Sequence, residues 1–370
     1  MRVIVSVFNN LATDQRVEKI CKTLTDNGYE VELIGNSWGG LLPMDRPYFF
    51  KRIELQSKIL KFAYLEYNWK LYQYLKDQNP SNTILWCNDL DILTANFYAS
   101  KKLNCPLIYD SHEIFTEMPA LQGRFTQKIW RFLEKQFIYK IKYKVAASSS
   151  YANWFKENYS IETPIILQNF PRRLEFKQQL TNHIPKIILY QGAINPSRGL
   201  DRIIPAMNRI DNAELWIAGS GPKLEDYKTL TTELNLDSKV KFLGNLHPDT
   251  LREITVKADV GLSIEENNGL SYFYSLPNKL SDYIQAHVPI VTSNFPEMKK
   301  VVEKYNVGEI IENHSEEELA KKIAIVLQNG KSYYASNLSK ASLELCWENE
   351  EPKILELLSK VIFENFNINR

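Results

Sequence analysis

A short segment in the second half of the chain, ILYQGAINPSRGLDRII, has the residue types that bind a phosphate group. An apolar strand pattern ends at Gly192, and Arg198 and a second glycine stand just before a helical pattern. A glycine lets a ligand approach the backbone closely, and a helix start offers free N–H groups and the positive end of a dipole. The forked charge of an arginine suits phosphate. Gly192 and Arg198 are therefore candidate ligands of a phosphate-bearing anion.

A second cation lies in the segment SYFYSLPNKLSDYIQAHVPIV. Leu276, Pro277 and Asn278 lead into a helical pattern, and Lys279 stands in its first turn, where a cation opposes the helix dipole. A bound polyanion would remove that conflict. Asp282 follows one turn later, and carboxylates are the usual partners of ribose hydroxyls in nucleotide sites. The segment predicts a nucleotide site, and a capped surface helix is the plain alternative.

Two further turns in this half follow strand patterns. The turn GSGP begins at Gly219, and its glycines would let a ligand lie against the backbone, although a tight turn needs no ligand. Gly244, Asn245 and Leu246 follow the strand pattern VKFLG, where backbone amides and carbonyls could recognise the edge of a planar base.

In the first half of the chain, His112 and Glu113 directly follow the strand pattern PLIYD. Ligands of open parallel sheets bind beyond the carboxyl ends of the strands, so His112 is a candidate for catalysis, with a histidine satisfied inside its loop as the alternative. Asn9 and Asn10 follow the first strand pattern and tolerate the turn conformations that need positive φ. Asp14 is placed to cap the helix that comes next.

Strand and helix patterns alternate along both halves of the chain, which predicts the α/β class. Continuous apolar strands separated by helices predict a doubly wound parallel sheet. The pattern restarts at KIILYQG, so we expect one domain over residues 1–169, a polar, proline-flanked linker over 170–185 and a second domain over 186–350. A terminal helix is expected over 351–368.

The composition is typical of a soluble globular protein, with 370 residues, 44% apolar and 24% charged. No apolar run reaches the roughly 18 residues that span a bilayer, and the first residues form a strand pattern rather than a secretory leader. The four cysteines are scattered and form no CxxC pair. We therefore expect reduced thiols and a cytoplasmic protein.

Two segments, 51–76 and 124–144, interleave aromatic residues with cations. Such helices can rest on an anionic bilayer, so a peripheral position on the inner face of the cytoplasmic membrane is one expectation. An ordinary amphipathic helix with a solvated basic face is equally open. Nucleic acid is not expected as a partner, because no recognition motif accompanies the charge.

Together these segments resemble the retaining glycosyltransferases of family 4, the group 1 glycosyltransferases of surface polysaccharide assembly. The segment YQG…SRGLDRII is similar to the donor-phosphate segment of that family, ELWIAGSGP to its Gly-x-Gly-Pro turn and VKFLGNL to its base-binding loop. LPNKLSDYIQAHVP is similar to the helix that ends its Glu-x7-Glu motif, and YDSHE to its histidine loop. The resemblance covers nearly the whole chain. It implies the GT-B fold, in which two Rossmann-like domains face a cleft and the last helix returns to the first domain.

The resemblance implies that the first domain binds the acceptor and the second the nucleotide-sugar donor. Gly192 would admit the donor diphosphate, Arg198 would pair with it, and Asp282 would bind the ribose. The implied catalytic residues are His112, which would lie beside the transferred sugar, Arg198 and Lys279. The implied donor site comprises Gly192, Arg198, Gly219, Gly244, Asn245, Leu246, Glu265, Ser275, Leu276, Pro277, Asn278, Lys279 and Asp282. The implied acceptor side comprises Asn9, Asn10 and Glu113.

The chain departs from the family pattern at three places. Ala193 stands where the family commonly has an arginine, and we expect Lys279 to replace that charge. Tyr274 aligns with the first glutamate of the Glu-x7-Glu motif, so Glu265 or Glu266 would have to take its contact with the donor sugar. The first loop carries Asn9 and Asn10 in place of the usual glycines.

The function implied is metal-independent, retaining transfer of a hexose to a glycan, with no cofactor beside the donor. The basic aromatic segments favour a lipid-linked acceptor of capsule, exopolysaccharide or O-antigen synthesis. Two alternatives remain: a nucleotide-sugar 2-epimerase of similar fold, and a non-catalytic GT-B binding protein. Asp89 and Asp91 form the carboxylate pair of metal-dependent GT-A transferases, but they lie inside a parallel α/β domain. A dinucleotide dehydrogenase is disfavoured because neither domain opens with GxGxxG.

Overall fold

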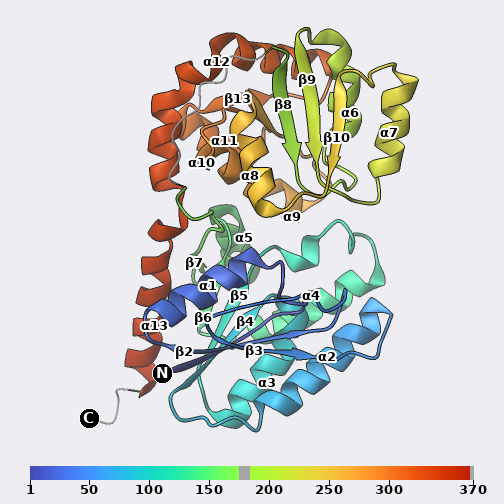
Figure 1. Cartoon of the computed structure of the whole chain (residues 1–370). Helices are drawn as coiled ribbons and strands as arrows, with labels where there is room; N and C mark the ends of the chain where they lie inside the picture. Colours follow the sequence, from blue (N-terminus) through green and yellow to red (C-terminus); the bar gives the residue numbers. More distant parts are fainter. Residues whose placement is uncertain (175–183, 367–370) are drawn as a thin grey trace. The chain divides into compact units, whose positions relative to one another are not determined.

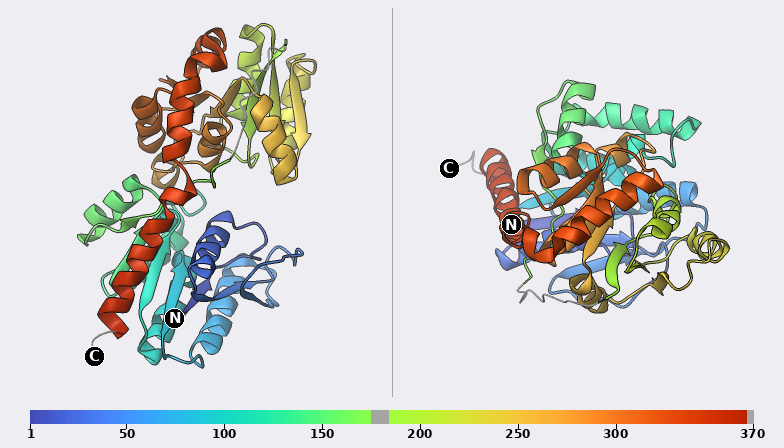
Figure 2. Two further views of the ribbon diagram at one scale, coloured as in Figure 1. Left: turned by 60° about the vertical axis from the view of Figure 1, so that its left-hand side comes forward. Right: turned by 90° about the horizontal axis from the view of Figure 1, so that it is seen from above.

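The chain divides into two α/β units in a computed structural model, which describes residues 1–174 and 184–366 (Figure 1, Figure 2). The N-terminal unit comprises Met1–Asn169 and Glu350–Arg370, and the C-terminal unit comprises Phe170–Asn349. Each unit is built on one parallel sheet, so the predicted pair of doubly wound α/β domains is confirmed. Residues 175–183 of the predicted linker lie outside the described residues.

The N-terminal sheet has seven strands in the order β3-β2-β1-β4-β5-β6-β7. Its strands are β1 (Arg2–Ser6), β2 (Glu30–Asn36), β3 (Phe49–Ile53), β4 (Thr83–Asn88), β5 (Leu107–Ser111), β6 (Tyr143–Ala146) and β7 (Ile165–Ile166). The central strand β1 pairs with β2 on one side and β4 on the other, with Val3 opposite Val31 and Ile84. All three of these side chains are buried, as expected for a strand covered on both faces.

Among the described residues of this unit, six α-helices surround the sheet. They are α1 (Gln15–Asp26), α2 (Leu60–Leu75), α3 (Leu93–Leu103), α4 (Phe125–Ile138), α5 (Ser149–Tyr159) and the terminal helix α13 (Glu351–Phe366), with short 3-10 turns η1 (Leu90–Ile92) and η2 (Phe115–Glu117). The connection from β1 to β2 moves towards one edge of the sheet, whereas the connections from β3 to β4, from β4 to β5 and from β5 to β6 move towards the other edge. Because connections between parallel strands are right-handed, α2, α3 and α4 lie on the face opposite α1. Helix α2 contacts α3, and α3 contacts α4.

The terminal helix α13 belongs to the N-terminal unit and packs on α1. The hydroxyl of Thr23 donates a hydrogen bond of 2.9 Å to the Glu351 carboxylate, and Tyr143 donates one of 2.5 Å to Glu364 at the other end of the helix. The chain therefore returns to its first unit after completing the second.

The C-terminal sheet has six strands in the order β10-β9-β8-β11-β12-β13. Its strands are β8 (Lys186–Gln191), β9 (Ala213–Ala218), β10 (Val240–Gly244), β11 (Val260–Ser263), β12 (Ile290–Ser293) and β13 (Gly308–Ile311). Its helices are α6 (Leu200–Ala206), α7 (Leu224–Glu233), α8 (Pro248–Lys257), α9 (Leu270–Phe273), α10 (Asn278–Gln285), α11 (Pro296–Tyr305) and α12 (Glu316–Glu344), with 3-10 turns η3 (Met207–Arg209) and η4 (Trp347–Asn349). The central strand β8 is buried from Ile187 to Gln191, and its residues Ile187, Ile188, Leu189 and Tyr190 belong to the core of the unit.

Two local predictions are wrong. The segment 51–76 is not one helix, because its first residues complete β3 and only Leu60–Leu75 is helical. The first loop takes positive φ at Leu11 (φ 70°) and not at Asn9 or Asn10. The two asparagine side chains instead accept hydrogen bonds from the backbone two residues on, which turns the chain and buries Leu11. Asp14 caps α1 as predicted by accepting a hydrogen bond from the Val17 N–H.

All four cysteines are buried and unpaired. Across residues 1–174 and 184–366, no helix has both the length and the apolar character needed to cross a bilayer.

Candidate functional site

The two predicted cations of the C-terminal unit meet at one carboxylate. Arg198 lies in the loop after β8, and Lys279 is the second residue of α10. The Lys279 Nζ atom lies 2.8 Å from Oε1 of Glu265, and Arg198 Nη1 lies 3.7 Å from the same oxygen. Arg198, Glu265 and Lys279, from three separate segments, thus form one cluster, which we call the cation cluster.

Glu265 is fully buried and also accepts a hydrogen bond of 2.9 Å from the Ser263 hydroxyl. Burial alone would raise the pKa of Glu265, but the charges of Lys279 and Arg198 outweigh it and hold that pKa below its usual range. The carboxylate is therefore ionised and neutralises part of the two cations. This counter-ion resolves the conflict between Lys279 and the α10 dipole inside the protein. The neighbouring Glu266 pairs instead with Arg202 at 3.0 Å.

Each cation of the cluster also lies over an aromatic ring. Lys279 Nζ is 4.1 Å from the ring centroid of Tyr190, and the Arg198 guanidinium carbon is 4.7 Å from that of Tyr272. Arg198 Nη2 also donates a hydrogen bond of 3.4 Å to the Tyr272 hydroxyl. Cation–π contacts of this kind hold a charge in place without neutralising it. Neither tyrosine is predictable from the sequence, because nothing in the local sequence marks it as the partner of a distant cation.

Three of the predicted glycines lie in adjacent loops at the carboxyl ends of β8, β9 and β10. The Gly192 N–H donates to Ala218 O at 2.9 Å, and the Gly219 N–H donates to Gly244 O at 2.8 Å. A Cβ on Gly219 would lie 1.9 Å from Gly192 O, so this glycine is required for the close approach of the two loops. A Cβ on Gly192 would lie 3.7 Å from Lys279 Cε, so the lysine reaches the loop that lacks the usual arginine. Asn245 is exposed and Leu246 packs on the core beside them.

The entry to α10 completes this side of the site. Pro277 occupies the N-cap position, and no side chain caps the helix there. Ser275 is held by a hydrogen bond of 2.8 Å from its hydroxyl to Tyr272 O. Asp282 lies half-buried one turn into the helix and accepts a hydrogen bond of 3.2 Å from the Gln191 side chain. Leu276 and Asn278 flank the proline, and Lys279 is the residue of this segment that joins the cation cluster. Their contacts with a donor stay predictions.

In the N-terminal unit, His112 lies at the carboxyl ends of β4 and β5 among acidic and amide side chains. Its Nδ1 is 3.2 Å from Asp89 Oδ2, and its Nε2 is 3.0 Å from Asn88 Oδ1 and 3.7 Å from Asp110 Oδ2. The His112 backbone N–H also donates to Asp89 Oδ1 at 2.8 Å. Arg16 on α1 closes the cluster by donating to Asp110 Oδ1 at 2.7 Å.

These neighbours determine the charge of His112. Burial alone would lower the pKa of His112, but the carboxylates of Asp89 and Asp110 outweigh it and raise that pKa to about 9. The imidazole is therefore a cation at neutral pH and can donate hydrogen bonds, but it cannot accept a proton there. Burial likewise opposes ionisation of Asp110, yet Arg16 and His112 hold the pKa of Asp110 below its usual range.

Asp89 adopts a backbone conformation that is almost confined to glycine, with φ 65° and ψ 167°. Such a conformation costs on the order of 1–3 kcal/mol and persists where the surroundings fix it. Here the Asp89 N–H donates to Asp110 O at 2.9 Å, while its carboxylate binds His112. The contact between Asp89 and His112 is not predictable from the sequence, in which Asp89 stands out only as part of the Asp89–Asp91 pair. In the part of the chain that the structure describes, no group of three or more His, Cys, Asp and Glu side chains could hold a metal ion.

The predicted acceptor-side residues lie in the same unit and are already engaged. Asn9 donates a hydrogen bond of 2.7 Å to the capping carboxylate of Asp14. Glu113 accepts one of 2.7 Å at its backbone carbonyl from the Ser111 hydroxyl. Asn10 accepts the Ala12 N–H. Their contact with an acceptor stays a prediction.

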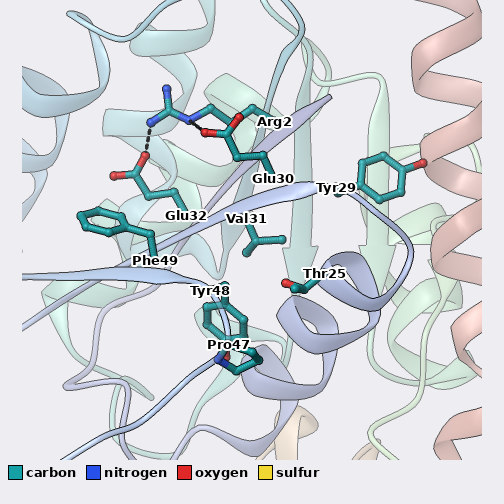
Figure 3. Close-up of a pocket in the computed structure, with 9 residues that line it drawn as sticks. All are labelled: Arg2, Thr25, Tyr29, Glu30, Val31, Glu32, Pro47, Tyr48 and Phe49. Atoms are coloured by element: carbon teal, nitrogen blue, oxygen red, sulfur yellow. Dashed lines mark hydrogen bonds and ion pairs between the residues drawn. The ribbon is translucent and has the colours of Figure 1, made fainter.

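A cavity of about 400 Å³ also occurs in the N-terminal unit, at the amino ends of β1, β2 and β3 (Figure 3). Arg2 and Glu30, the first residues of β1 and β2, lie on its wall with Glu32 and the aromatic side chains of Tyr48 and Phe49. Figure 3 shows Arg2 beside Glu30 and Glu32, with which it forms ion pairs. None of the predicted site residues lines it.

Comparison of the sequence with known proteins finds similarity to glycosyltransferases. Residues 171–342 match the family model described as "Glycosyl transferases group 1". An uncharacterized glycosyltransferase of Methanocaldococcus jannaschii is 38% identical over 78 residues, which are 20% of this chain and 20% of that protein. The lipopolysaccharide core biosynthesis glycosyltransferase LpsD of Rhizobium meliloti is 33% identical over 58 residues, 16% of this chain and 17% of that protein. The matched segments thus span about a fifth or less of these curated relatives.

Solved structures share the fold over almost the whole chain. Sucrose-phosphate synthase from Thermosynechococcus elongatus superposes with a TM-score of 0.79 at 13% identity, covering 98% of this chain and 99% of that one. HepE from Anabaena, in complex with UDP, superposes with a TM-score of 0.74 at 16% identity, covering 97% of this chain and 100% of that one. The chain therefore has the GT-B fold, and the residues that match the group 1 glycosyltransferase model include the cation cluster.

Proposed function

We propose that the protein is a retaining glycosyltransferase that moves a hexose from a nucleotide-sugar donor to a glycan acceptor without a metal ion. The observation that carries the proposal is the cation cluster of Arg198, Glu265 and Lys279, which lies beside the Gly192 loop inside the group 1 domain. We assign the donor to the C-terminal unit and the acceptor to the N-terminal unit.

The cation cluster suits the charge that develops in sugar transfer. When the glycosidic bond to the donor breaks, negative charge builds on the departing diphosphate, and groups already in place stabilise it most effectively. Two cations and one carboxylate leave a net positive charge at the start of α10, whose first-turn N–H groups have no side-chain cap. Arg198 and Lys279 would then supply the positive charge that a metal ion supplies in other transferases.

The nucleotide would lie along the loops that follow β8 and β10. Asp282 on α10 would accept hydrogen bonds from the ribose hydroxyls, and the backbone at Gly244, Asn245 and Leu246 would contact the base. Because HepE is named as a complex with UDP and, in a second structure, with UDP-glucose, uridine nucleotides are the first donors to test.

His112 would act on the acceptor or the transferred sugar as a hydrogen-bond donor. Its raised pKa makes it a cation at neutral pH, which suits orientation of a hydroxyl group and opposes a role as general base. In a retaining transfer on one face of the sugar, the leaving diphosphate itself would take the proton of the acceptor hydroxyl.

The acceptor that we propose is a lipid-linked glycan of bacterial surface polysaccharide synthesis. The curated relative LpsD, named for lipopolysaccharide core biosynthesis, supports this choice. Helices α2 and α4 of the N-terminal unit, which interleave aromatic residues with cations, independently support a lipid-linked acceptor.

A thermal-shift panel of nucleotide sugars tests the donor site, since a ligand that binds only the folded state raises the unfolding temperature. We expect one nucleotide to stabilise the protein, and its sugar conjugate to be consumed on addition of acceptor, with full activity in chelator. Isomerised sugar without acceptor would indicate an epimerase. Binding with neither transfer nor donor hydrolysis would indicate a non-catalytic protein, and loss of activity in chelator would contradict the metal-independent mechanism.

A further inference from the structure

Helix α2 has two apolar stripes on opposite faces. Its buried stripe consists of Ala63, Tyr67, Leu71 and Leu75, which repeat every four residues and pack towards the sheet. Half a turn away lie Phe62, Leu65 and Trp69, whose side chains are 50%, 70% and 63% exposed. A helix that needs only to cover a sheet has polar residues on that outer face.

Helix α4 repeats the arrangement. Its inner face holds the buried Glu134, Phe137 and Ile138. Its outer face carries Phe125, Ile129 and Phe132, spaced by four and three residues and 76%, 45% and 62% exposed. These residues form one stripe along the helix, because side chains at such spacings project from the same side.

The two outer stripes belong to one side of the N-terminal unit. Helices α2, α3 and α4 cover the same face of the sheet and pack in that order. The ring of Tyr64 on α2 contacts that of Trp130 on α4, with centroids 5.7 Å apart. Between the helices, Tyr98 of α3 is 54% exposed and contacts Phe137 of α4. We call the six exposed residues of α2 and α4 the docking face: Phe62, Leu65, Trp69, Phe125, Ile129 and Phe132.

The charge around the docking face is positive. Lys61 precedes the α2 stripe, and Lys128 and Lys135 flank the α4 stripe, all three exposed. The acidic residues of these two helices are engaged elsewhere: Glu134 is buried, and Glu66 is paired with Lys70 at 2.7 Å. Among the residues that the structure describes, no carboxylate forms an ion pair with Lys128 or Lys135.

We propose that the docking face binds the surface of an anionic bilayer. Helices with aromatic and aliphatic side chains on one face and lysines beside them lie in the membrane interface, where the rings enter the headgroup layer and the cations meet anionic lipids. A second copy of the chain fits poorly, because a symmetric dimer would oppose identical cation-rich faces. The proposal adds a membrane partner to the proposed function without depending on donor chemistry.

Sedimentation with lipid vesicles tests the proposal. We expect the full chain to bind vesicles of phosphatidylglycerol and phosphatidylcholine, to bind pure phosphatidylcholine at least tenfold more weakly, and to be released by salt. The double variant Phe125→Glu/Phe132→Glu should lose binding at least tenfold. Phe363→Glu is the matched control, since Phe363 is 71% exposed on α13 in the same unit and should leave binding unchanged.

A charge variant, Lys128→Gln/Lys135→Gln, keeps the apolar stripe and should weaken binding to anionic vesicles only. Circular dichroism and urea unfolding, which need no ligand, show that each variant is folded. No binding of the wild-type chain to anionic vesicles would overturn the proposal, as would equal loss in the Phe363→Glu control. A concentration-dependent dimer abolished by Phe125→Glu/Phe132→Glu would assign the docking face to a second copy instead.

Discussion

Lys279 and Glu265 form an ion pair of 2.8 Å inside the C-terminal unit, and both side chains are almost completely withdrawn from water. The pair joins the first turn of α10 to the residue two positions beyond β11. It lets a lysine stand at a helix start before any ligand is bound, and the same carboxylate lies beside Arg198. A diphosphate arriving at this cluster would therefore meet cations that are already held in position.

Replacing Glu265 by glutamine should destabilise the C-terminal unit by about 3 kcal/mol, because removal of one partner leaves a buried charge without its counter-ion. The pKa of Glu265 is lowered on folding, so the ionised carboxylate stabilises the fold above the ordinary pKa of glutamate, and this contribution disappears as the pH falls. Urea unfolding should show a weaker loss of stability at acidic pH in Glu265→Gln than in the wild type. Glu266→Gln, next in sequence but partly exposed and paired with the exposed Arg202, is the control and should change stability by less than about 0.5 kcal/mol. Equal effects of the two variants would contradict the role of Glu265.

Removing the Arg198 guanidinium should reduce turnover by at least about 100-fold, the scale of one lost transition-state donor. Arg198 would stabilise the negative charge that develops on the leaving diphosphate in the transition state, so kcat should fall more than the affinity for the donor. Steady-state kinetics of Arg198→Ala with the donor found in the thermal-shift panel measures both quantities. Arg202→Ala, four residues further on and paired with Glu266, should retain the wild-type rate. A wild-type rate in Arg198→Ala would exclude the arginine from the mechanism.

The stability of the N-terminal unit should fall as the pH rises from about 6.5 to about 9. The pKa of His112 is raised to about 9 in the folded protein against about 6.5 for an ordinary histidine. The protonated ring therefore contributes its full stabilisation below the unfolded pKa and loses it as the pH passes through the folded pKa. The shift corresponds to at most about 3 kcal/mol. Urea unfolding at a series of pH values should show this slope in the wild type and not in His112→Gln. An identical slope in both would mean that His112 is not the titrating group.

The contacts that raise the pKa of His112 show which parts of the site can be predicted from the sequence and which cannot. Gly192, Arg198, Lys279 and His112 are recognisable as candidates because each follows a strand or opens a helix, where parallel sheets place ligands, and their roles stay predictions. Their partners could not be found in the same way. Arg16 and Asp110 are 94 residues apart, and Asp89 was recognisable only as half of a carboxylate pair.

The same limit applies to conformations that depend on packing. Leu11 takes the positive φ that its neighbouring asparagines were expected to take, because burial of the leucine side chain against Gly35 decides the turn. The strand at the start of segment 51–76 was hidden by its cations, which suit an edge strand as well as a helix.

His112→Ala should abolish sugar transfer while leaving nucleotide binding intact. The imidazole belongs to the N-terminal unit, and the predicted nucleotide contacts belong to the C-terminal one. Isothermal titration with the nucleotide separates binding from transfer. His247→Ala, an exposed histidine that only caps α8, serves as the control. If nucleotide binding disappeared together with transfer in His112→Ala, the assignment of His112 to the sugar or acceptor would be wrong.

Alanine at Gly219 and at Gly244 should have different effects, although both glycines have positive φ. A Cβ on Gly219 would collide with the backbone at Gly192 O, so Gly219→Ala must displace the Gly192 loop from its place beside Lys279. A Cβ on Gly244 meets no atom within 4 Å, so Gly244→Ala carries only the conformational cost of about 1 kcal/mol. We expect Gly219→Ala to lose at least tenfold in nucleotide affinity, and Gly244→Ala to lose stability with little change in affinity for the diphosphate moiety. Titration of both variants with a nucleoside diphosphate and with inorganic pyrophosphate measures the difference. Wild-type affinity in Gly219→Ala would show that the Gly192 loop does not bind the diphosphate.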